Sequence, residues 1–460
     1  MHIVKRLALK GFVRSRRQLS MLFGLGERQF AKTYRYPDVD LIGLEQRFGR
    51  ENMERIYFHI AAFEAMPLAS LQPEVFDLGP LSRFYTSAFE SLWRTVFRKA
   101  GAQWRYENNL PDYDGPAFDG SLSNCATAGP VEIRAGKVPA LCFSGGGKDS
   151  LVAMKLLERG GVPFSSYTYS HPVYGEANEQ HDLIDGLLQA AIPRQHHRMQ
   201  ISDDFASCSL CVETPTAVFG SLPVALEYGY RYLVVGHERS AEAGNLDWDL
   251  TGEHVNHQWG KSLEAKMLLG DYIQTELAAV SYFSILKPIH DVVIFNLLRS
   301  DLEAVQSTHS CNQRKPWCQE CAKCAYVWLG YTAYLPQDLV TGMFPRNLFD
   351  TPENLSWFRQ LLGLAAHKPF ECVGETSEVQ LAFEICRRKG MQGQALDMYA
   401  NEVPTPDVPA LLDRYLAVDQ TVPTIPPAVR QRVLPQMLHA AEQARKYIRE
   451  VAIAPVVGVG

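Results

Sequence analysis

The residue types that bind phosphate stand together in one short run, Ser144-Gly145-Gly146-Gly147-Lys148-Asp149-Ser150. Glycines let a backbone approach a phosphate without a Cβ clash and turn several N–H groups toward it. Lys148 supplies a positive charge, and the two serines can donate hydrogen bonds to phosphate oxygens. Asp149 is the kind of ligand that Mg²⁺ prefers beside phosphate oxygens. The run therefore predicts a phosphate site with magnesium, and a glycine turn without a ligand is the less favoured alternative.

Two further segments, residues 237–240 and 255–264, are dense in polar side chains. Arg239 and Lys261 are suited to neutralise a phosphate or a carboxylate. The side chains suited to move protons are His237, Glu238 and His257. A solvated loop explains such density equally well, so both interpretations stay open.

Four cysteines lie within fourteen residues: Cys311, Cys318, Cys321 and Cys324. Four thiolates at about 2.3 Å satisfy tetrahedral Zn²⁺, and short Cys-x2-Cys spacings supply that geometry. An iron–sulfur cluster and four free buried thiols are the alternatives. The ten cysteines of this long chain, with no secretion signal in the sequence, indicate metal or redox sites rather than disulfides.

Three other cysteines are candidates for thiol chemistry. Cys372 lies in the segment 368–374 and would serve as a base toward a carbon acid if Lys368 or a helix N-terminus lowered its pKa. A small buried hydrophobic residue is the commoner role of such a cysteine. Cys208 and Cys211 form another close pair, which is either redox-active or coincidental.

Strands and helices alternate around the glycine run. An apolar strand is expected over Val138–Phe143 and a helix over Asp149–Arg159. The elements expected next are a strand over Phe164–Tyr169, helices over Glu179–Ala191 and Thr216–Tyr228, and a strand over Tyr230–Gly236. This alternation predicts an α/β fold with a parallel sheet, in which ligands bind beyond the carboxyl ends of the strands. Ser144 and His237 each follow a strand, so both are expected at that edge.

Three regions are expected along the chain. Residues 1–135 read as an α-rich N-terminal region, with amphipathic helices over Glu51–Ala65 and Ser82–Ala100. Residues 136–340 hold the α/β domain and the cysteines. Residues 341–460 read as a smaller, mostly helical C-terminal domain, with helices over Ser377–Lys389 and Gln436–Glu450. Basic residues near the N-terminus are read as the solvated end of a helix or strand.

The glycine run differs from the P-loop of kinases and GTPases, which needs four residues between its first glycine and Gly-Lys-[Ser/Thr]. It resembles the Ser-Gly-Gly-x-Asp-Ser signature of the ATP pyrophosphatase (PP-loop) superfamily. That resemblance implies a HUP-like, adenine nucleotide alpha hydrolase domain in which residues 144–150 hold the pyrophosphate of ATP and a substrate is adenylated. The pair Gly147-Lys148 stands where some members have a single residue.

Later motifs resemble one family within that superfamily, the MurL family. The similarity spans about residues 140 to 390, and His237 stands where asparagine is expected. The motifs are Glu238-Arg239-Ser240, Asn256-His257-Gln258, Lys261-Ser262-x-Glu264, Trp317-Cys318-x2-Cys321-x-Lys323-Cys324 and Lys368-Pro369-Phe370-Glu371-Cys372-Val373-Gly374.

The resemblance implies a bacterial, cytoplasmic isomerase of peptidoglycan biosynthesis, with a role in cell wall biogenesis and cell shape. Such an enzyme converts the terminal L-Glu of UDP-MurNAc-L-Ala-L-Glu to D-Glu through an acyl-adenylate, with ATP and Mg²⁺. Arg239 or Lys261 would hold the substrate. The proton-transfer pair would come from Glu238, His257, Glu371 and Cys372. The cysteines would bind structural zinc, as they do in PP-loop enzymes that form a nitrile on a deazapurine.

Composition restricts the other possibilities. Hydrophobic residues make up 46% and charged residues 21%, which is typical of a globular protein, and the formal net charge is −6. This charge disfavours a nucleic-acid partner, and no apolar run is long enough for membrane insertion. Two alternatives remain: a PP-loop enzyme that modifies RNA or a deazapurine, and a zinc-stabilised ATP-binding module without catalysis. The sequence leaves the oligomeric state open.

Overall fold

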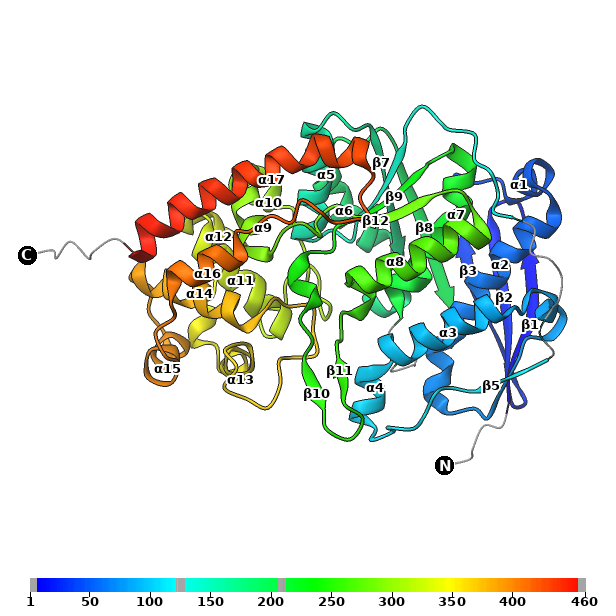
Figure 1. The fold of residues 1–460 in the computed structure, drawn as a ribbon, viewed down its shortest axis with the longest axis horizontal. Coiled ribbons are helices and arrows are strands. Elements are labelled where there is room, and N and C mark those ends of the chain that lie inside the picture. Colours follow the sequence, from blue (N-terminus) through cyan, green and yellow to red (C-terminus); the bar gives the residue numbers. More distant parts are fainter. Residues whose placement is uncertain (1–5, 121, 123–128, 206–209, 211, 454–460) are drawn as a thin grey trace, which may run out of the picture.

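The computed structural model describes residues 6–120, 122, 129–205, 210 and 212–453 of the 460-residue chain. A single ten-stranded sheet, in the order β12-β9-β6-β7-β8-β3-β2-β1-β4-β5, runs through the larger part of the molecule. Helices cover both faces of this sheet, and a helical C-terminal part lies beyond its β12 end (Figure 1). The fold is therefore α/β, as the sequence predicts.

Five parallel strands make up one half of the sheet. The chain passes from β6 through β7 to β8, then crosses back to β9 and β12 on the other side of β6. Strand order thus reverses between β6 and β9, and ligands of such sheets bind at this point, beyond the carboxyl ends. The strands are β6 (Ala140–Phe143), β7 (Phe164–Ser170), β8 (His196–Asp203), β9 (Tyr232–Val235) and β12 (Ser281–Ser284).

The three strands that the sequence predicts here are confirmed as β6, β7 and β9, whereas β8 and β12 were missed. In β8 polar and buried residues alternate, and β12 has only four residues. The three helices predicted after the glycine run are also confirmed. They are α5 (Lys148–Arg159), α6 (Ala177–Ala191) and α7 (Glu213–Tyr228).

The other half of the sheet comes from the N-terminal region. Strand β3 pairs antiparallel with β8 and continues into an antiparallel meander, and two short strands extend the sheet in parallel. The expectation of an α-rich region was wrong in missing these strands, because the buried positions of β1 do not follow a regular two-residue alternation. The strands are β1 (Arg6–Arg14), β2 (Gln18–Leu25), β3 (Arg28–Arg35), β4 (Val75–Asp77) and β5 (Ala117–Asp119).

Successive residues of each parallel strand point to opposite faces and so enter two different cores. Ala140 and Cys142 of β6 pack in one core with α5, α6 and the C-terminal helices. Leu141 packs in the other core with α7 and the N-terminal helices. Besides α7, this second core includes α1 (Leu41–Phe48), α2 (Arg50–Glu64), α3 (Ser87–Ala100) and α8 (Leu263–Tyr272). The sheet and this core cross residue 135, where a domain boundary was expected.

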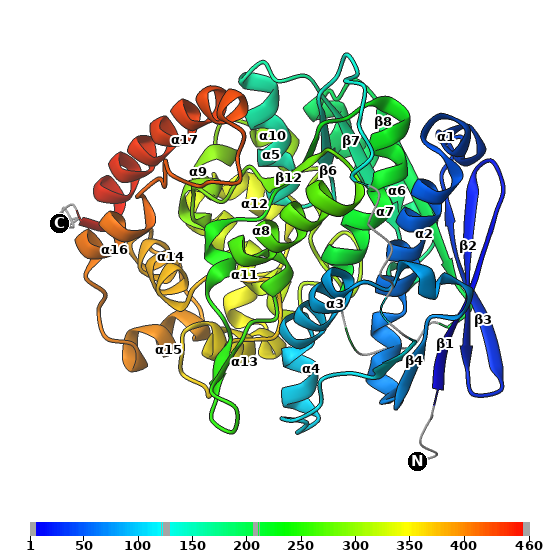
Figure 2. The same ribbon diagram turned by 45° about the vertical axis from the view of Figure 1, so that its right-hand side comes forward.

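The C-terminal part is helical and packs on the α5 side of the sheet (Figure 2). Two of its helices were predicted and are confirmed as α14 (Thr376–Arg388) and α17 (Pro427–Ile448). The remaining α-helices of the whole molecule are α4 (Ala102–Glu107), α9 (Asp291–Leu298), α10 (Leu302–Val305), α11 (Ala322–Tyr334), α12 (Gln337–Met343), α13 (Pro352–Leu361), α15 (Gln394–Glu402) and α16 (Val408–Tyr415). A separate hairpin is formed by β10 (Leu246–Trp248) and β11 (Glu253–Val255). Within the described ranges, every helix falls short of the length and apolarity that crossing a membrane requires.

Candidate active site

The glycine run forms the turn between β6 and α5, at the point where strand order reverses. Gly147 caps the helix, and Gly146 has the left-handed φ of +80° that a residue with a side chain rarely adopts. The Ser144 N–H donates to the Tyr167 carbonyl at 2.8 Å, and the Gly145 N–H donates to the Ser150 hydroxyl at 3.1 Å. We call residues 144–150 the phosphate loop.

Residues His309 and Ser310 close over this loop and were not singled out in the sequence. The His309 N–H donates to the Gly146 carbonyl at 2.8 Å. A Cβ atom added to Gly146 would lie 2.1 Å from the His309 ring, and one added to Gly147 would lie 2.7 Å from the Ser310 hydroxyl. Close packing therefore favours glycine at both positions, and the left-handed turn also favours it at Gly146.

Substitution of Gly146 with alanine is expected to destabilise the protein. A left-handed alanine costs about 1–2 kcal/mol, and the new Cβ would displace the His309 ring. We expect the midpoint of thermal unfolding to fall by about 4 °C, measured by calorimetry. Gly145→Ala is the matched control, because its Cβ would meet nothing within 4 Å. Equal midpoints for the two variants would contradict this description of the loop.

Lys148 points into the protein rather than toward the open side of the loop. Only 2% of its side chain is exposed, and its ammonium group lies 2.6 Å from an Asp149 carboxylate oxygen and 2.5 Å from Asp291. Burial, Glu238 and Asp291 together outweigh Lys148 and raise the pKa of Asp149 to about 6. In this structure the charge of Lys148 thus serves to hold two carboxylates together.

Two buried oxygens near the loop lack hydrogen-bond partners among the described residues: the Ser144 hydroxyl and Oε2 of Glu238. Buried polar atoms are normally paired, so each is suited to a ligand. Ser144 is suited to donate to a phosphate oxygen, and Glu238 is suited to accept from a bound group. Strands β6 and β9, which precede Ser144 and Glu238, both end at the carboxyl edge of the parallel half of the sheet.

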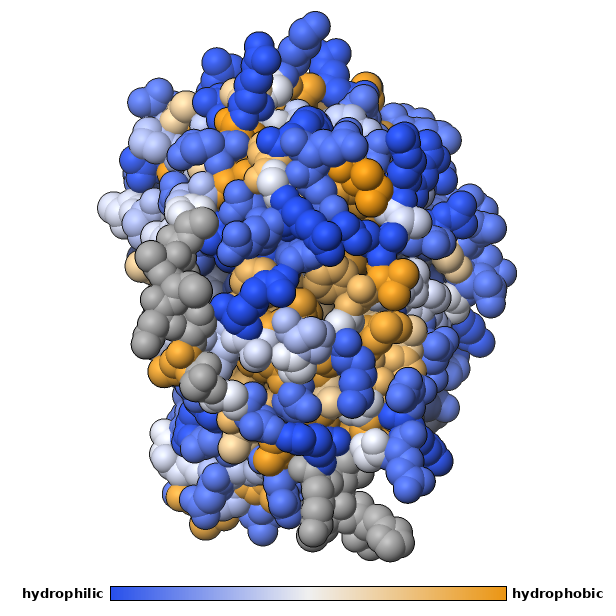
Figure 3. All heavy atoms as spheres, turned by 90° about the vertical axis from the view of Figure 1, so that its right-hand side faces the viewer, coloured by the Kyte–Doolittle hydropathy of each residue, from blue (hydrophilic) through white to orange (hydrophobic). Residues whose placement is uncertain are grey.

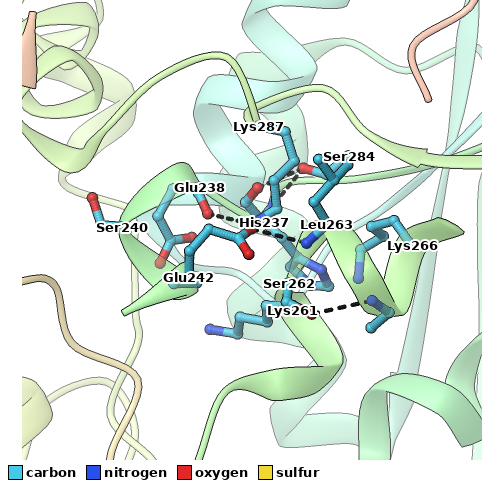
Figure 4. A network of polar contacts seen from close by, with 12 residues as sticks. His237, Glu238, Ser240, Glu242, Lys261, Ser262, Leu263, Lys266, Ser284 and Lys287 are labelled. Carbon is cyan, nitrogen blue, oxygen red and sulfur yellow. Dashed lines mark hydrogen bonds and ion pairs between the residues drawn. The ribbon is translucent and has the colours of Figure 1, made fainter. Parts of the chain in front are cut away.

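The turn after β9 gathers acidic and basic side chains with α8 and β12 (Figure 4). Lys287 donates to the Glu238 carbonyl at 2.7 Å and forms an ion pair with Glu242. Burial opposes the charge of Glu238, but Lys261 and Lys148 outweigh it and lower its pKa to about 2. Burial lowers the pKa of His237 well below its ordinary value, which makes His237 a neutral ring at physiological pH.

Arg239 does not join this group. Its side chain lies near His290 and Asp419, where its charge contributes to lowering the pKa values of both. It therefore faces the C-terminal helices, although it is adjacent in sequence to Glu238. Arg239 is not among the main charges that shift the pKa of Cys372 or of Glu238.

The remaining predicted residues converge on Cys372. Its thiol, a ring nitrogen of His257 and a carboxylate oxygen of Glu371 lie within 4.8 Å of one another. Burial opposes ionisation of the thiol, but Lys261, His257 and Lys323 outweigh it and lower the pKa of Cys372 to about 7. Lys323 was not predicted to belong here. We call these five residues the thiol site.

His257 and Lys261 both favour a thiolate at Cys372. Burial opposes protonation of His257, but Cys372 and Glu371 raise its pKa. Its Nδ1 lies 2.5 Å from the Gln103 side-chain oxygen, which is an acceptor, so this nitrogen holds a proton. Burial likewise opposes the charge of Lys261, but Cys372, Glu238 and Asp149 raise its pKa. Lys261 therefore links the thiol site to the phosphate loop.

The β10–β11 hairpin and the turn that follows it fix the thiol site in place. The Asn245 amide donates to the Pro369 carbonyl at 2.7 Å, and its oxygen accepts from the His257 N–H at 2.9 Å. The Gln258 amide donates to the Val373 carbonyl at 2.9 Å. These bonds hold the two chain segments that carry His257 and Cys372 side by side.

The four cysteines form a compact buried cluster whose sulfur atoms lie within 4.8 Å of one another. Cys311 and Cys321 are 3.8 Å apart, as are Cys318 and Cys324. Four thiolates at about 2.3 Å from a tetrahedral zinc are about 3.8 Å apart. Backbone N–H groups donate to the sulfurs of Cys311, Cys318 and Cys321 at 3.4–3.5 Å. The cysteine cluster thus fits zinc.

This cluster lies between the phosphate loop and the thiol site. Cys311 follows directly on Ser310, and Cys321 caps α11, which carries Lys323. Lys323 donates to the Cys372 carbonyl, and the Asn312 amide donates to Glu371 at 3.0 Å. A metal in the cluster would therefore position both sites. The other cysteine pair, Cys208 and Cys211, lies outside the described residues.

Comparison with known proteins finds two family models that match the chain. The MurL N-terminal domain matches residues 215–285, and the MurL C-terminal domain matches residues 305–407. The first range contains Glu238, His257 and Lys261, and the second contains the cysteine cluster and Cys372. The phosphate loop lies outside both ranges. No solved structure matches the chain significantly.

Three curated relatives are named UDP-N-acetyl-alpha-D-muramoyl-L-alanyl-L-glutamate epimerase. The protein of Salinispora tropica is 30% identical over 64% of this chain and 65% of its own length. That of a Micromonospora species is 29% identical over 65% and 67%, and that of Xanthomonas oryzae pv. oryzae is 28% identical over 75% and 78%. The chain thus spans just under two thirds of the Salinispora relative. The chain is thus similar to MurL proteins over two segments, and to these three epimerases over 64% to 75% of its own length.

Proposed function

We propose that this chain epimerises the terminal L-Glu of UDP-MurNAc-L-Ala-L-Glu to D-Glu, using ATP and releasing AMP and diphosphate, in peptidoglycan precursor synthesis. The observation that carries the proposal is the convergence of a phosphate-binding loop and a low-pKa thiol on one site, joined by Lys261 and Glu238. The names of the relatives supply the substrate. We place the reaction in the cytoplasm, where ATP and nucleotide sugars are made.

ATP is proposed because the reaction removes a proton from the Cα atom beside a free carboxylate. The carbanion would then carry two adjacent negative charges, so its formation would require a high activation energy. Transfer of AMP to the carboxylate gives an acyl-adenylate, whose neutral ester-like group withdraws electrons and lowers that barrier. Hydrolysis afterwards releases AMP and the product. ATP thus lowers a kinetic barrier, since the two epimers differ little in free energy.

The phosphate loop, within a PP-loop domain, is the proposed site of the pyrophosphate of ATP. The Ser144 hydroxyl has no partner among the described residues, and the backbone around Gly145 faces open space. Asp149 and Asp291, held together by Lys148, offer the carboxylate oxygens that Mg²⁺ prefers. A bound Mg²⁺ would neutralise charge on the phosphates. Preorganised donors of this kind stabilise the charge that develops during adenylation.

Cys372 is the proposed base that removes the Cα proton. Its pKa of about 7 lies near physiological pH, where a general base is most effective. His257 and Lys261 keep the thiolate charged, and Lys261 is also placed to meet the substrate carboxylate. Glu238, with its pKa of about 2, stays ionised and is therefore poorly suited to return a proton.

The experiment that tests the proposal supplies the purified protein with Mg²⁺, ATP and UDP-MurNAc-L-Ala-L-Glu. AMP is quantified, and the configuration of the glutamate is determined by chiral chromatography. We expect AMP and D-Glu to appear together, and neither to appear without ATP. A folded protein that forms neither product would contradict the proposal and would direct attention to deazapurine and RNA substrates.

A further inference from the structure

A cavity lies away from the thiol site. It has a volume of about 290 Å³ and is bounded by β2, β3, the ends of β7 and β8, and the first turns of α7. None of the thiol-site residues lines it. Its walls combine N-terminal strands with the parallel half of the sheet.

One wall of this cavity is aromatic. Phe23 and Phe30 are stacked with ring centroids 5.5 Å apart, and Phe30 and Phe205 are tilted with centroids 4.9 Å apart. Figure 3 shows apolar side chains gathered near the middle of one face of the molecule. Flat aromatic surfaces of this kind stack against the ring of a base.

The floor of the cavity is polar and acidic. Lys32 lies 2.5 Å from Glu64 and 3.3 Å from Asp203, and all three side chains are nearly buried. Glu213 accepts from the Tyr174 hydroxyl at 2.6 Å and also lines the cavity. Three carboxylates against one lysine disfavour a phosphate and favour hydrogen-bond donors such as sugar hydroxyls and base N–H groups.

Two contacts connect this cavity to the active site. Lys315 lies with its ammonium group 5.8 Å from the centre of the Tyr174 ring, and its charge also reaches His309 above the phosphate loop. A Cβ atom on Gly260 would lie 3.1 Å from Thr214, so the first turn of α7 touches the turn that carries Lys261. These two contacts thus connect the lining of the cavity with the residues around the phosphate loop and the thiol site.

We propose that this cavity binds the nucleoside of the nucleotide-sugar substrate. The aromatic wall takes the base, the carboxylates take hydroxyl and N–H donors, and Lys315 outside the acidic floor meets the diphosphate. Three strand spacings separate β8 from β9, or about 14 Å, a distance that the diphosphate, sugar and alanyl groups would span. This inference rests on the proposed function for the identity of the substrate.

Direct binding of UDP and of ATP with Mg²⁺ to the full chain, measured by calorimetry, tests the assignment. Phe30→Ala removes part of the aromatic wall, and Asp203→Asn removes a floor charge at constant volume while leaving Lys32 paired with Glu64. We expect each to weaken UDP binding at least about tenfold and to leave ATP binding unchanged. Phe12→Ala is the matched control, because Phe12 packs on Tyr57 from β1 outside the cavity.

Three results would overturn the assignment: no UDP binding by the native chain, unchanged UDP binding in both variants, or loss of ATP binding in place of UDP binding. Thermal unfolding would reveal whether Phe30→Ala folds. If it does not, UDP binding by Asp203→Asn decides the assignment. The assay requires no turnover. Native protein that forms AMP and D-Glu while the variants bind UDP normally would therefore remove this assignment and leave the proposed function intact.

Discussion

The variant Cys372→Ala should lose epimerisation by about 10³-fold while still releasing AMP when supplied with ATP and UDP-MurNAc-L-Ala-L-Glu. The thiol is the proposed base for the Cα proton, whereas adenylation is proposed to take place at the phosphate loop. Chiral chromatography of the glutamate, exchange of the Cα proton in deuterated water, and AMP quantification separate the two steps. Cys386→Ala is the control, because Cys386 is buried in the helical core away from both sites.

The pH dependence gives an independent check on this role. A base acts in its deprotonated form, so activity should rise as pH passes through about 7, the pKa of Cys372. Alkylation of Cys372 by iodoacetamide, followed by mass spectrometry, should show the same midpoint. Lys261→Gln removes the main positive charge beside the thiolate, so it should move that midpoint upward toward the ordinary thiol value. A full rate of epimerisation in Cys372→Ala, or a midpoint near 9 in the native protein, would remove Cys372 from the mechanism.

Substitution of Cys321 with serine should cost much of the stability of the C-terminal half. Cys321 is proposed to bind zinc and caps α11, whose residues are almost all buried. Binding of a structural zinc contributes on the order of 10 kcal/mol to folding. We expect one equivalent of zinc in the native protein, measured by mass spectrometry of the metal, and a thermal midpoint lower by at least about 10 °C in the variant.

The same variant should also lose AMP formation, because the cluster supports both Ser310 at the phosphate loop and Lys323 at the thiol site. Cys142→Ala is a matched control, since Cys142 is a buried cysteine of β6 that lies outside the cluster. A native protein without bound metal, whose stability is unchanged by a strong chelator, would contradict the assignment. Detection of iron and inorganic sulfide in the native protein would replace the zinc assignment with an iron–sulfur cluster, the alternative that the sequence leaves open.

Local patterns made the elements around the phosphate loop predictable. A short apolar strand, a glycine run and an amphipathic helix follow one another directly, so β6, the loop and α5 could be placed from neighbouring residues alone. Strands β1 to β3 could not, because what makes them strands is pairing with each other and with β8. The buried positions of β1 alternate with basic residues only in part, and a bulge shifts its register near Gly11.

The candidate site was predictable to a similar extent. His257, Lys261 and Cys372 were singled out by residue type and Glu371 by its resemblance to a family motif, and the four do meet. Lys323, Asp291 and His309 were missed, since their roles come from contacts with segments far away in the sequence, such as Lys323 with Cys372. Arg239 shows the converse limit: its residue type is suited to an anion, but the turn after β9 directs it toward Asp419.

The pairing of β3 with β8 also constrains the order in which the chain can assemble during synthesis. Lys32 pairs with Asp203, so the edge of β3 stays open until roughly 170 further residues have left the ribosome. An open strand edge is a template for pairing with another chain. The nascent N-terminal region would therefore need shielding, or a neighbouring chain could supply the missing β8 and yield an exchanged dimer. Translation speed between these two strands should thus influence how much of the protein reaches its proper form.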